Sequence, residues 1–499
     1  MQNLNESLQA KYPHLELAIL PLSQVKKGNE AFRIDSEPFK KSNLSLNSNI
    51  EYIKLSQIAT INPSKTEIQK YDENLEVTFL SMQNLGNGFV NERDKGAIKY
   101  FKGGYTYFAE NDILIAKITP CMEHGKCAIA TNLTNKIGFG STEFNVFRVK
   151  DSRFLQEFIF CYLNRDNIRK IAADNMVGTS GRQRVPTAFY ENLPIPLFPK
   201  PFQLEIEKLV KQSHEALEDS KRLYKEAQEL LYKELELDFK NPLEFLLKSS
   251  LQVKKAGEAT NINDISKKYP HLNISVRPLS KSLYKSERLD SEYYQSKYDL
   301  METKIKDYKG GYCKLQDIGF FTNGSFIPEN LYTQHAKRAY IRIKELSFNT
   351  PIRIQECIYI DDNFEATNET MVKQDDFVIA TIGNTIGKIN LIPKELSGSF
   401  ISNNTSRFRL ADKSIIPEFL ELLLRNFVVQ EQIQREFTQT AQPKISNTSL
   451  ENILIPKINP ATQEQIALKI QKSFTLRAKS KDLLKNAKIK LENAIEMAN

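Results

Sequence analysis

The chain contains an internal duplication, and this feature constrains its fold more than any other. Lys11-Tyr12-Pro13-His14-Leu15 returns as Lys268-Tyr269-Pro270-His271-Leu272, and Arg33-Ile34-Asp35-Ser36-Glu37 returns as Arg288-Leu289-Asp290-Ser291-Glu292. Self-similarity at a long offset indicates that one structural unit is built twice. A chain of 499 residues also exceeds what one hydrophobic core usually supports. We therefore predict two copies of one structural plan.

Fainter matches continue into the interior of each copy and indicate its fold class. The matched pairs are Asn111-Asp112-Ile113-Leu114-Ile115-Ala116 with Asp375-Asp376-Phe377-Val378-Ile379-Ala380, Gly125-Lys126 with Gly387-Lys388, Phe147-Arg148-Val149 with Phe408-Arg409-Leu410, and Glu191-Asn192-Leu193-Pro194-Ile195-Pro196 with Glu451-Asn452-Ile453-Leu454-Ile455-Pro456. Short apolar, β-branched runs bounded by Gly, Pro and Asn are typical of buried strands. The sequence therefore predicts an α+β lobe in each copy.

Each lobe is followed by a long segment without Gly or Pro, 202–237 in the first copy and 461–498 in the second. Apolar residues in these segments recur at spacings of three and four, which predicts amphipathic helices. A helix of about 36 residues is roughly 54 Å long, more than one lobe needs for its own core. We expect the two apolar stripes to bury against each other. The stripes are Ile206, Leu209, Val210, Leu217, Leu223, Leu230 and Leu231, and Ile466, Ile470, Leu483, Leu484, Ala487, Leu491 and Ile495.

Charge and cysteine content narrow the functional class. A net charge of +8 and a sequence pI near 8.9 are compatible with a polyanionic partner, because Lys and Arg displace counterions from phosphates. Five cysteines are few for this length and odd in number, which argues against a disulfide framework. No stretch reaches about 18 consecutive apolar residues, and the first residues do not look like a signal peptide. We expect a cytoplasmic protein without a membrane partner.

Catalytic and metal motifs are weak. Gly383-Asn384-Thr385-Ile386-Gly387-Lys388-Ile389 is one residue short of a phosphate-binding loop and has Ile389 where magnesium needs Ser or Thr, so we predict a strand-turn-strand. Cys121, His124 and Cys127 could ligate zinc with a fourth ligand from elsewhere, but the second copy lacks this trio. We therefore expect no metal and no catalytic residue, since the loops of a base methyltransferase are also missing.

Polar loops rich in Thr, Ser, Asn, Gln, Arg and Lys recur at matching places in both copies. Arg can form a forked contact with guanine, and Asn or Gln with adenine, each worth about 1–3 kcal/mol of discrimination. One such loop alone is better explained as a solvated turn, whereas recurrence in both copies favours DNA binding. The candidate DNA-binding residues are Lys117, Thr119, Lys126, Ser141, Thr142, Arg182, Gln183, Arg184, Thr381, Asn384, Thr385, Lys388, Asn403, Asn404, Thr405, Gln442 and Lys444.

With its repeated words, its lobe-plus-helix plan and its lack of catalytic motifs, the chain resembles the specificity subunit (HsdS-like) of a type I restriction-modification system. The resemblance implies two target recognition domains, each reading one half of an interrupted DNA site, and two long antiparallel helices that form a coiled-coil spacer. The implied organisation is an N-terminal conserved segment (1–48), target recognition domain 1 (49–200), spacer helix 1 (201–240), a central conserved connection (241–310), target recognition domain 2 (311–460) and spacer helix 2 (461–499).

The same resemblance implies partners and cofactors. The subunit would be non-catalytic by itself and part of an adenine-specific DNA methyltransferase and ATP-dependent endonuclease complex. Its partners would be double-stranded DNA with a bipartite site, two modification subunits docked on the helices, and restriction subunits. S-adenosylmethionine would be bound by the modification subunit, and ATP and magnesium by the restriction subunit. The shared Arg-Ile/Leu-Asp-Ser-Glu segments and helices would face these shared partners.

Three alternatives remain open. A specificity subunit of a type IIB-like system has the same two lobes and works with a combined nuclease-methylase, and neighbouring genes would distinguish it. A two-lobed protein-binding adaptor would carry its basic charge incidentally, and salt-dependent binding to duplex DNA would discriminate against it. A free-standing enzyme would depend on Cys121, His124 and Cys127 alone, and metal analysis would test it.

Overall fold

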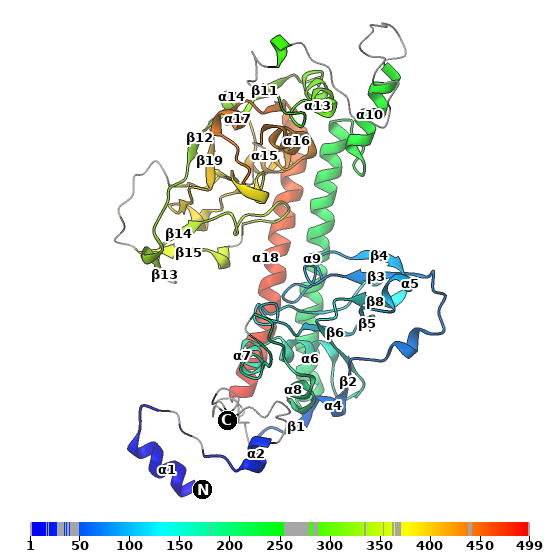
Figure 1. Ribbon diagram of the computed structural model, residues 1–499, viewed down its shortest axis with the longest axis vertical. Helices are drawn as coiled ribbons and strands as arrows, with labels where there is room; N and C mark the ends of the chain where they lie inside the picture. Colours follow the sequence, from blue (N-terminus) through cyan, green and yellow to red (C-terminus); the bar gives the residue numbers. More distant parts are fainter. Residues whose placement is uncertain are drawn as a thin grey trace. The chain divides into compact units, whose positions relative to one another are not determined.

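The computed structural model describes residues 2–15, 17, 19–26, 34, 36, 39, 49–179, 181–253, 279–282, 288–333, 336–352, 354–361, 364, 371–437 and 442–497. Part of the predicted N-terminal segment, the repeated 268–272 and part of the central connection lie outside these residues. The chain divides into two compact units, 1–218 with 477–499, and 219–476. Each unit mixes helices and strands (Figure 1), which confirms the predicted α+β plan. None of the described helices combines the length and apolar character that a bilayer span requires.

The lobe of the first unit contains two four-stranded sheets. One sheet is antiparallel, in the order β2-β9-β6-β7 (Ala59–Ile61, Phe144–Val149, Ile113–Ala116, Cys127–Ile129). The other has the order β4-β3-β8-β5 (Asp94–Ala97, Glu76–Leu80, Ile137–Gly140, Thr106–Ala109), and its β3 and β8 run parallel. A two-stranded pair, β1 (Tyr52–Lys54) with β10 (Pro194–Pro196), joins the two ends of the lobe. The shorter elements are α1 (Gln2–Lys11), α2 (Leu22–Lys26), α4 (Leu55–Ile58), η2 (Lys65–Ile68), α5 (Ile98–Phe101), η3 (Thr134–Lys136), α6 (Gln156–Leu163), α7 (Asp166–Asp174) and α8 (Thr187–Asn192).

The lobe of the second unit repeats the antiparallel sheet and the two-stranded pair, whereas its other sheet places the parallel pair at one edge instead of in the centre. Its antiparallel sheet has the order β12-β19-β16-β17 (Gly319–Asn323, Thr405–Leu410, Phe377–Ala380, Ile389–Leu391), and β11 (Tyr312–Lys314) pairs with β20 (Leu454–Pro456). The other sheet, β13-β15-β14-β18 (Tyr332–Thr333, Ile358–Ile360, Arg338–Ile341, Phe400–Ile401), keeps the parallel pair as β14 and β18. Its shorter elements are α10 (Pro242–Val253), η5 (Leu279–Lys281), α13 (Ser296–Lys306), α14 (Leu315–Ile318), η6 (Glu329–Leu331), η7 (Ile354–Glu356), η9 (Gly383–Thr385), η10 (Lys394–Leu396), α15 (Pro417–Leu424), α16 (Phe427–Glu436) and α17 (Asn447–Glu451).

The sequence segments that match between the two copies form the same contacts in both lobes. In the first unit the Arg148 guanidinium donates to both carboxylate oxygens of Asp112, at 2.8 and 2.7 Å, and in the second unit Arg409 donates to both oxygens of Asp376, at 2.7 Å each. The Asp of each pair is almost fully buried. Burying a carboxylate destabilises the folded state unless the carboxylate is paired and hydrogen-bonded. Each Asp therefore needs its Arg partner. The repetition therefore preserves the interior of the lobe.

Two long helices, α9 (Lys200–Glu234) and α18 (Pro460–Met497), confirm the predicted helical segments. Both helices begin slightly earlier than predicted, and each has a proline, Pro201 or Pro460, in its first turn. The N–H groups of the first turn have no acceptor within the helix, so a proline, which lacks an N–H, is accepted there. Their apolar stripes contact the lobes as well as each other. One core of the first unit joins Ile206 of α9 and Leu491 of α18 to Phe147 and Phe158 of the lobe, and the main core of the second unit is built in the same way.

Contacts between α9 and α18 show that the helices are antiparallel within each unit. In the first unit Glu205 pairs with Lys490, and the Ser213 hydroxyl donates to the Ser480 carbonyl oxygen at 2.6 Å. In the second unit the Ser473 hydroxyl donates to the Ser220 carbonyl oxygen at 2.7 Å, and Lys469 contacts Glu226 at 2.6 Å. In both units the partner residue on α18 has a lower number as the residue number on α9 rises. The predicted antiparallel arrangement is therefore confirmed.

Candidate nucleic-acid interface

In the first lobe, backbone hydrogen bonds bring three predicted loops together. The Lys117 N–H, directly after β6, donates to the Glu143 carbonyl oxygen at 2.9 Å. The Val185 N–H donates to the Lys117 carbonyl oxygen at 2.9 Å, and the Thr119 N–H donates to Gln183 at 3.0 Å. The loops after β6, between β8 and β9, and before α8 thus form one continuous surface element.

The second lobe makes the same three hydrogen bonds at the matching places. The Thr381 N–H donates to the Asn404 carbonyl oxygen at 3.0 Å, the Ile445 N–H to Thr381 at 3.1 Å, and the Gly383 N–H to Pro443 at 2.9 Å. Candidates that are far apart in sequence are therefore neighbours in both lobes. We call these elements the loop clusters, 117–119 with 141–143 and 181–185, and 381–385 with 402–405 and 442–445.

The candidates of the first loop cluster differ in exposure. Thr142 and Arg182 are exposed, whereas Lys117, Ser141 and Gln183 are half-buried. Two candidates are engaged by acidic neighbours: the Thr119 hydroxyl donates to Glu123, and Arg184 donates to both carboxylate oxygens of Glu143, with Nη2 to Oε1 at 2.7 Å. Hydrogen bonding to Arg184 lowers the pKa of Glu143 below its usual value. The Arg184–Glu143 pair lies at the surface, where the Arg side chain is 43% exposed.

In the second loop cluster, Asn384, Asn403, Gln442 and Lys444 are exposed, and Asn404 and Thr385 are half-buried. Thr381 and Thr405 are buried, and the Thr405 hydroxyl donates to the Ser402 carbonyl oxygen at 2.7 Å. The Thr385 hydroxyl donates to the carbonyl oxygen of Ile382 at 3.0 Å. The exposed side chains of this cluster are thus amides and one ammonium group, which suit base edges and phosphates.

The two predicted lysines that follow the glycines, Lys126 and Lys388, lie at the ends of the β6–β7 and β16–β17 turns. The Lys126 ammonium donates to the Met82 carbonyl oxygen at 2.6 Å. The Lys388 ammonium lies 5.9 Å from the ring centroid of Phe348, which is 40% exposed. Both lysines therefore contact the loop that follows the parallel strand, β3 or β14. Sequence reasoning missed this loop, although Gly86-Asn87-Gly88 is a turn signal.

The segment from Gly383 to Ile389 is a strand-turn-strand, as predicted. β16 ends at Ala380, η9 forms the turn, and β17 begins at Ile389. Gly383 and Gly387 have φ values of 73° and 87°, a region that favours glycine. At Gly387 an added Cβ would also lie 2.4 Å from the Gln430 Oε1.

Cys121, His124 and Cys127 lie in and beside one tight turn. The Gly125 N–H donates to the Met122 carbonyl oxygen at 2.8 Å, and the Lys126 N–H to Cys121 at 3.1 Å. Complete burial raises the pKa of the Cys127 thiol to about 12, which disfavours the thiolate that metals require. Within the described ranges, no group of three or more His, Cys, Asp or Glu side chains is placed to hold a metal ion.

The shared Arg-Leu-Asp-Ser-Glu segment uses its charges inside the second unit. Arg288 forks onto Asp290, with Nε to Oδ1 at 2.8 Å and Nη2 to Oδ2 at 2.7 Å. The same guanidinium donates to the Phe437 carbonyl oxygen at 3.0 Å, just beyond α16, and lies 4.5 Å from the Tyr293 ring centroid. These contacts join the central connection to the lobe. The matching segment around Arg33 lies largely outside the described residues.

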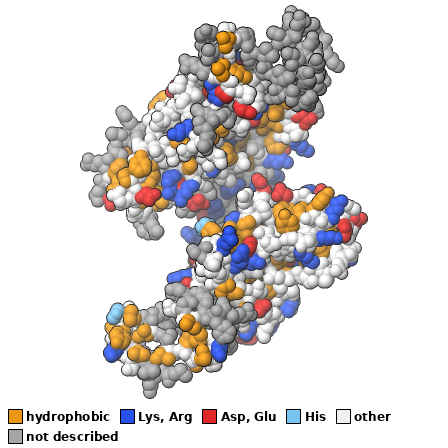
Figure 2. All heavy atoms as spheres, viewed as in Figure 1, with side chains coloured by type: hydrophobic (Ala, Val, Ile, Leu, Met, Phe, Trp, Pro, Cys, Tyr) orange, Lys and Arg blue, Asp and Glu red, His pale blue; other side chains and the backbone are white. Residues whose placement is uncertain are grey.

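Basic side chains are spread over the surface. Figure 2 shows Lys and Arg interleaved with Asp and Glu on the described surface of both units, on the face in view. The net charge of +8 is thus not concentrated in one field on this face. Binding to a polyanion would then depend on local groups such as those of the loop clusters.

Comparisons with known proteins agree on one family. The model for the "Type I restriction modification DNA specificity domain" matches residues 47–228 and 306–492. The Escherichia coli type I restriction enzyme EcoAI specificity subunit is 26% identical over 481 residues, which cover 88% of this chain and 80% of that protein. The E. coli EcoEI specificity subunit is 36% identical over 187 residues, or 37% of this chain and 30% of that protein. A solved S subunit of a type I restriction-modification system from M. genitalium aligns over 91% of this chain and 97% of that one, with 13% identity and a TM-score of 0.41, a likeness too weak to carry an argument.

Proposed function

Because the chain belongs to the type I restriction modification DNA specificity family, we propose that it is a DNA sequence-specificity subunit whose two lobes each read one half of a bipartite duplex site. The observation that carries this proposal is the pair of loop clusters, which the same three backbone hydrogen bonds build in both lobes. The cluster side chains differ between the lobes while the hydrogen bonds are shared. Two loop clusters with the same backbone arrangement and different side chains fit two half-sites of different sequence.

We assign reading to residues 49–200 and 311–460. The exposed and half-buried cluster residues contact bases and phosphates, with Arg182 and Gln183 leading in the first lobe and Asn403, Gln442 and Lys444 in the second. Arg and amide side chains can make two hydrogen bonds to one base edge in the major groove, and Lys contacts phosphates as a point charge. Helices α9 and α18 separate the two readers.

The catalytic work belongs to partner subunits in this proposal. Two modification subunits dock on the helical regions and carry S-adenosylmethionine for adenine methylation, and restriction subunits add cleavage driven by ATP and magnesium. The complex acts in the cytoplasm, where the five cysteines stay reduced. This chain decides where methylation and cleavage occur.

The test is methylome sequencing of cells that express the chain with its modification subunit. We expect one bipartite motif with a fixed gap. Replacing 49–200 by the same region of another specificity subunit should change one half of the motif and leave the other half and the gap unchanged. A continuous motif, or a change in both halves, would contradict independent readers. Absence of salt-dependent binding to duplex DNA, tested with the modification subunit present, would favour a protein-binding adaptor instead.

A further inference from the structure

In each unit one loop contacts the strand that follows the β6–β7 turn or the β16–β17 turn, which we call the reading turns, and is linked to α9, directly in the first unit and through Arg425 in the second. These junction loops are Gly86–Phe89 and Ser347–Thr350. They hold the same place in the fold, because each follows the strand that runs parallel to β8 or β18, after Leu80 in the first lobe and Ile341 in the second. Neither loop belongs to the loop clusters.

The first junction loop touches both long helices. The His214 Nε2 of α9 donates to the Gly88 carbonyl oxygen at 3.1 Å. Gly88 has a φ of 95°, and a Cβ added there would lie 2.2 Å from Leu484 Cδ2 of α18, so its backbone packs directly on that helix. The Asn164 amide, just after α6, donates to the Asn87 Oδ1 at 3.2 Å. A loop in this position cannot shift without breaking polar and steric contacts at once.

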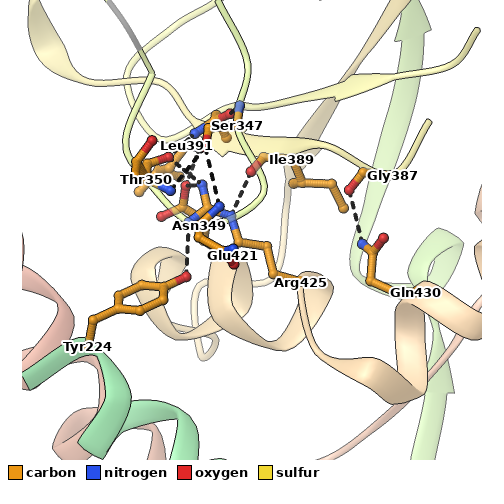
Figure 3. Close-up of polar contacts among 11 residues, drawn as sticks. Tyr224, Ser347, Asn349, Thr350, Gly387, Ile389, Leu391, Glu421, Arg425 and Gln430 are labelled. Atoms are coloured by element: carbon orange, nitrogen blue, oxygen red, sulfur yellow. Dashed lines mark hydrogen bonds and ion pairs between the residues drawn. The ribbon is translucent and has the colours of Figure 1, made fainter. Parts of the chain in front are cut away.

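The second junction loop is held by a buried ion pair (Figure 3). The Arg425 guanidinium donates to the Thr350 carbonyl oxygen at 3.2 Å, to Glu421 at 2.6 Å and to the Tyr224 hydroxyl of α9 at 3.2 Å. Arg425 follows α15 as Asn164 follows α6. At the matching place, the first lobe holds its junction loop with an amide–amide hydrogen bond and the second lobe holds its loop with a guanidinium group.

Each junction loop is also bonded to the strand that follows the reading turn. In the first lobe the Cys127 N–H donates to the Gly86 carbonyl oxygen at 3.0 Å, directly after Lys126. In the second lobe Arg425 donates to the Ile389 carbonyl oxygen at 2.8 Å, and the Ser347 N–H donates to the Asn390 Oδ1 at 2.7 Å, just after Lys388. The Arg425 and Ser347 donors of this network are all paired, and paired buried hydrogen bonds rigidify the parts they join.

We infer that the junction loops fix the orientation of each lobe on the helix pair and thereby determine which gap between half-sites the protein accepts. This inference rests on the proposed function. One added base pair moves a half-site by about 3.4 Å along the DNA and turns it by roughly 35°. A lobe held rigidly on the helices cannot follow that change, whereas a loosened lobe can. His214 and Tyr224 are positioning residues in this scheme.

The duplication supplies substitutions that remove only the polar contacts. At an offset of 260 residues, α18 carries Phe474 where α9 has His214, and Leu484 where α9 has Tyr224. His214→Phe and Tyr224→Leu therefore keep an apolar side chain that this helix pattern already accepts. Matched controls on the same helix are Gln212→Lys and Lys233→Asn. Both positions are exposed, and each receives the residue that α18 carries 260 positions later.

The experiment uses the full chain in complex with its modification subunit. The methylome of the wild-type complex gives the half-sites and the gap, and Kd is then measured for duplexes with that gap and with one base pair more or fewer. Each test variant should reduce the ratio of Kd for wrong-gap duplexes to Kd for the native-gap duplex by about 3- to 10-fold, the effect of one lost hydrogen bond, with base preferences unchanged. The controls should keep the wild-type ratio.

The outcomes separate the two proposals. A wild-type complex without a bipartite motif refutes the proposed function itself. A wild-type complex with a bipartite motif, together with test variants that keep the wild-type Kd ratio, refutes the positioning role alone. Altered base preference, or loss of binding to every duplex with an unchanged melting temperature, also overturns it. If a test variant has a lower melting temperature than wild type, the measurement is repeated with Tyr224→Phe. This variant removes only the hydroxyl group.

Discussion

Replacing Arg425 with methionine should destabilise the second unit strongly and in a pH-dependent way. The Arg425 and Glu421 side chains are 4% and 2% exposed, so the variant leaves a carboxylate buried without its counter-charge. Among the described residues, the second oxygen of Glu421 already has no hydrogen-bond partner. Breaking a buried pair from one side costs about 3–5 kcal/mol. At about 2–4 °C per kcal/mol for a unit of this size, the melting temperature should fall by roughly 6–20 °C.

The pH dependence follows from the carboxyl group. Burial raises the pKa of Glu421, and the charge of Arg425 opposes that rise. Without Arg425 the pKa rises further, so the folded state accepts the protonated acid and penalises the charged one. Because the pKa is higher in the folded state than in the unfolded state, the loss of stability should be full above the folded-state pKa. It should shrink as the pH falls toward the unfolded value of about 4.3.

Scanning calorimetry at several pH values measures both effects. Arg153→Met, which breaks an exposed forked pair with Asp151, is the matched control and should leave the melting temperature unchanged. The double variant Glu421→Leu/Arg425→Met should recover much of the loss, because it removes the unpaired charge. An Arg425→Met protein that melts within about 2 °C of wild type, or whose deficit does not depend on pH, would refute this reasoning.

Three further predictions follow from the structure. Glu143→Gln should free Arg184 and steepen the dependence of log K for duplex DNA on log salt by about 1, measured by fluorescence anisotropy, and an unchanged slope counts against Arg184 as a phosphate contact. Inserting one helical turn in α9 should lengthen the gap of the methylated motif, and an unchanged gap in the methylome would refute the spacer role. Asp112→Asn in the first lobe should cost about 2–3 kcal/mol in unfolding free energy, as should Asp376→Asn in the second, and calorimetry should show additive losses in the double variant.

The duplication was informative because its matched words encode local and paired contacts. Asp112 and Arg148 recur as Asp376 and Arg409, and the residues before the two Asp, Asn111 and Asp375, have φ values of 73° and 68°. Periodicity located both long helices, since a spacing of three and four residues records the buried face whatever covers it. The periodicity did not show that lobe residues, as well as the other long helix, pack against the buried face of each helix.

The candidate site was predictable only in part. Recurrence in both copies identified the loop clusters, but exposure depends on neighbours that are distant in sequence. The polar character of Thr405 suggested a surface position, and the structure buries it against Ser402. Arg184 was visible in the sequence, whereas its pairing with Glu143 required the fold. The contact of His214 with Gly88 joins residues without any shared pattern, so no periodicity could indicate it.

The buried serines of the long helices determine how the gap between half-sites can change. Ser213 contacts Ser480 and Ser220 contacts Ser473, and all four side chains are at most 1% exposed within otherwise apolar stripes. Sliding one helix by a turn would bury the Ser213 and Ser473 hydroxyls without their carbonyl acceptors and would separate the facing hydroxyls of each pair. A buried polar residue fixes the register of a coiled coil in the same way. The helix pair therefore has one alignment. A new gap must come from added or removed turns, and related proteins should differ in spacing by discrete steps.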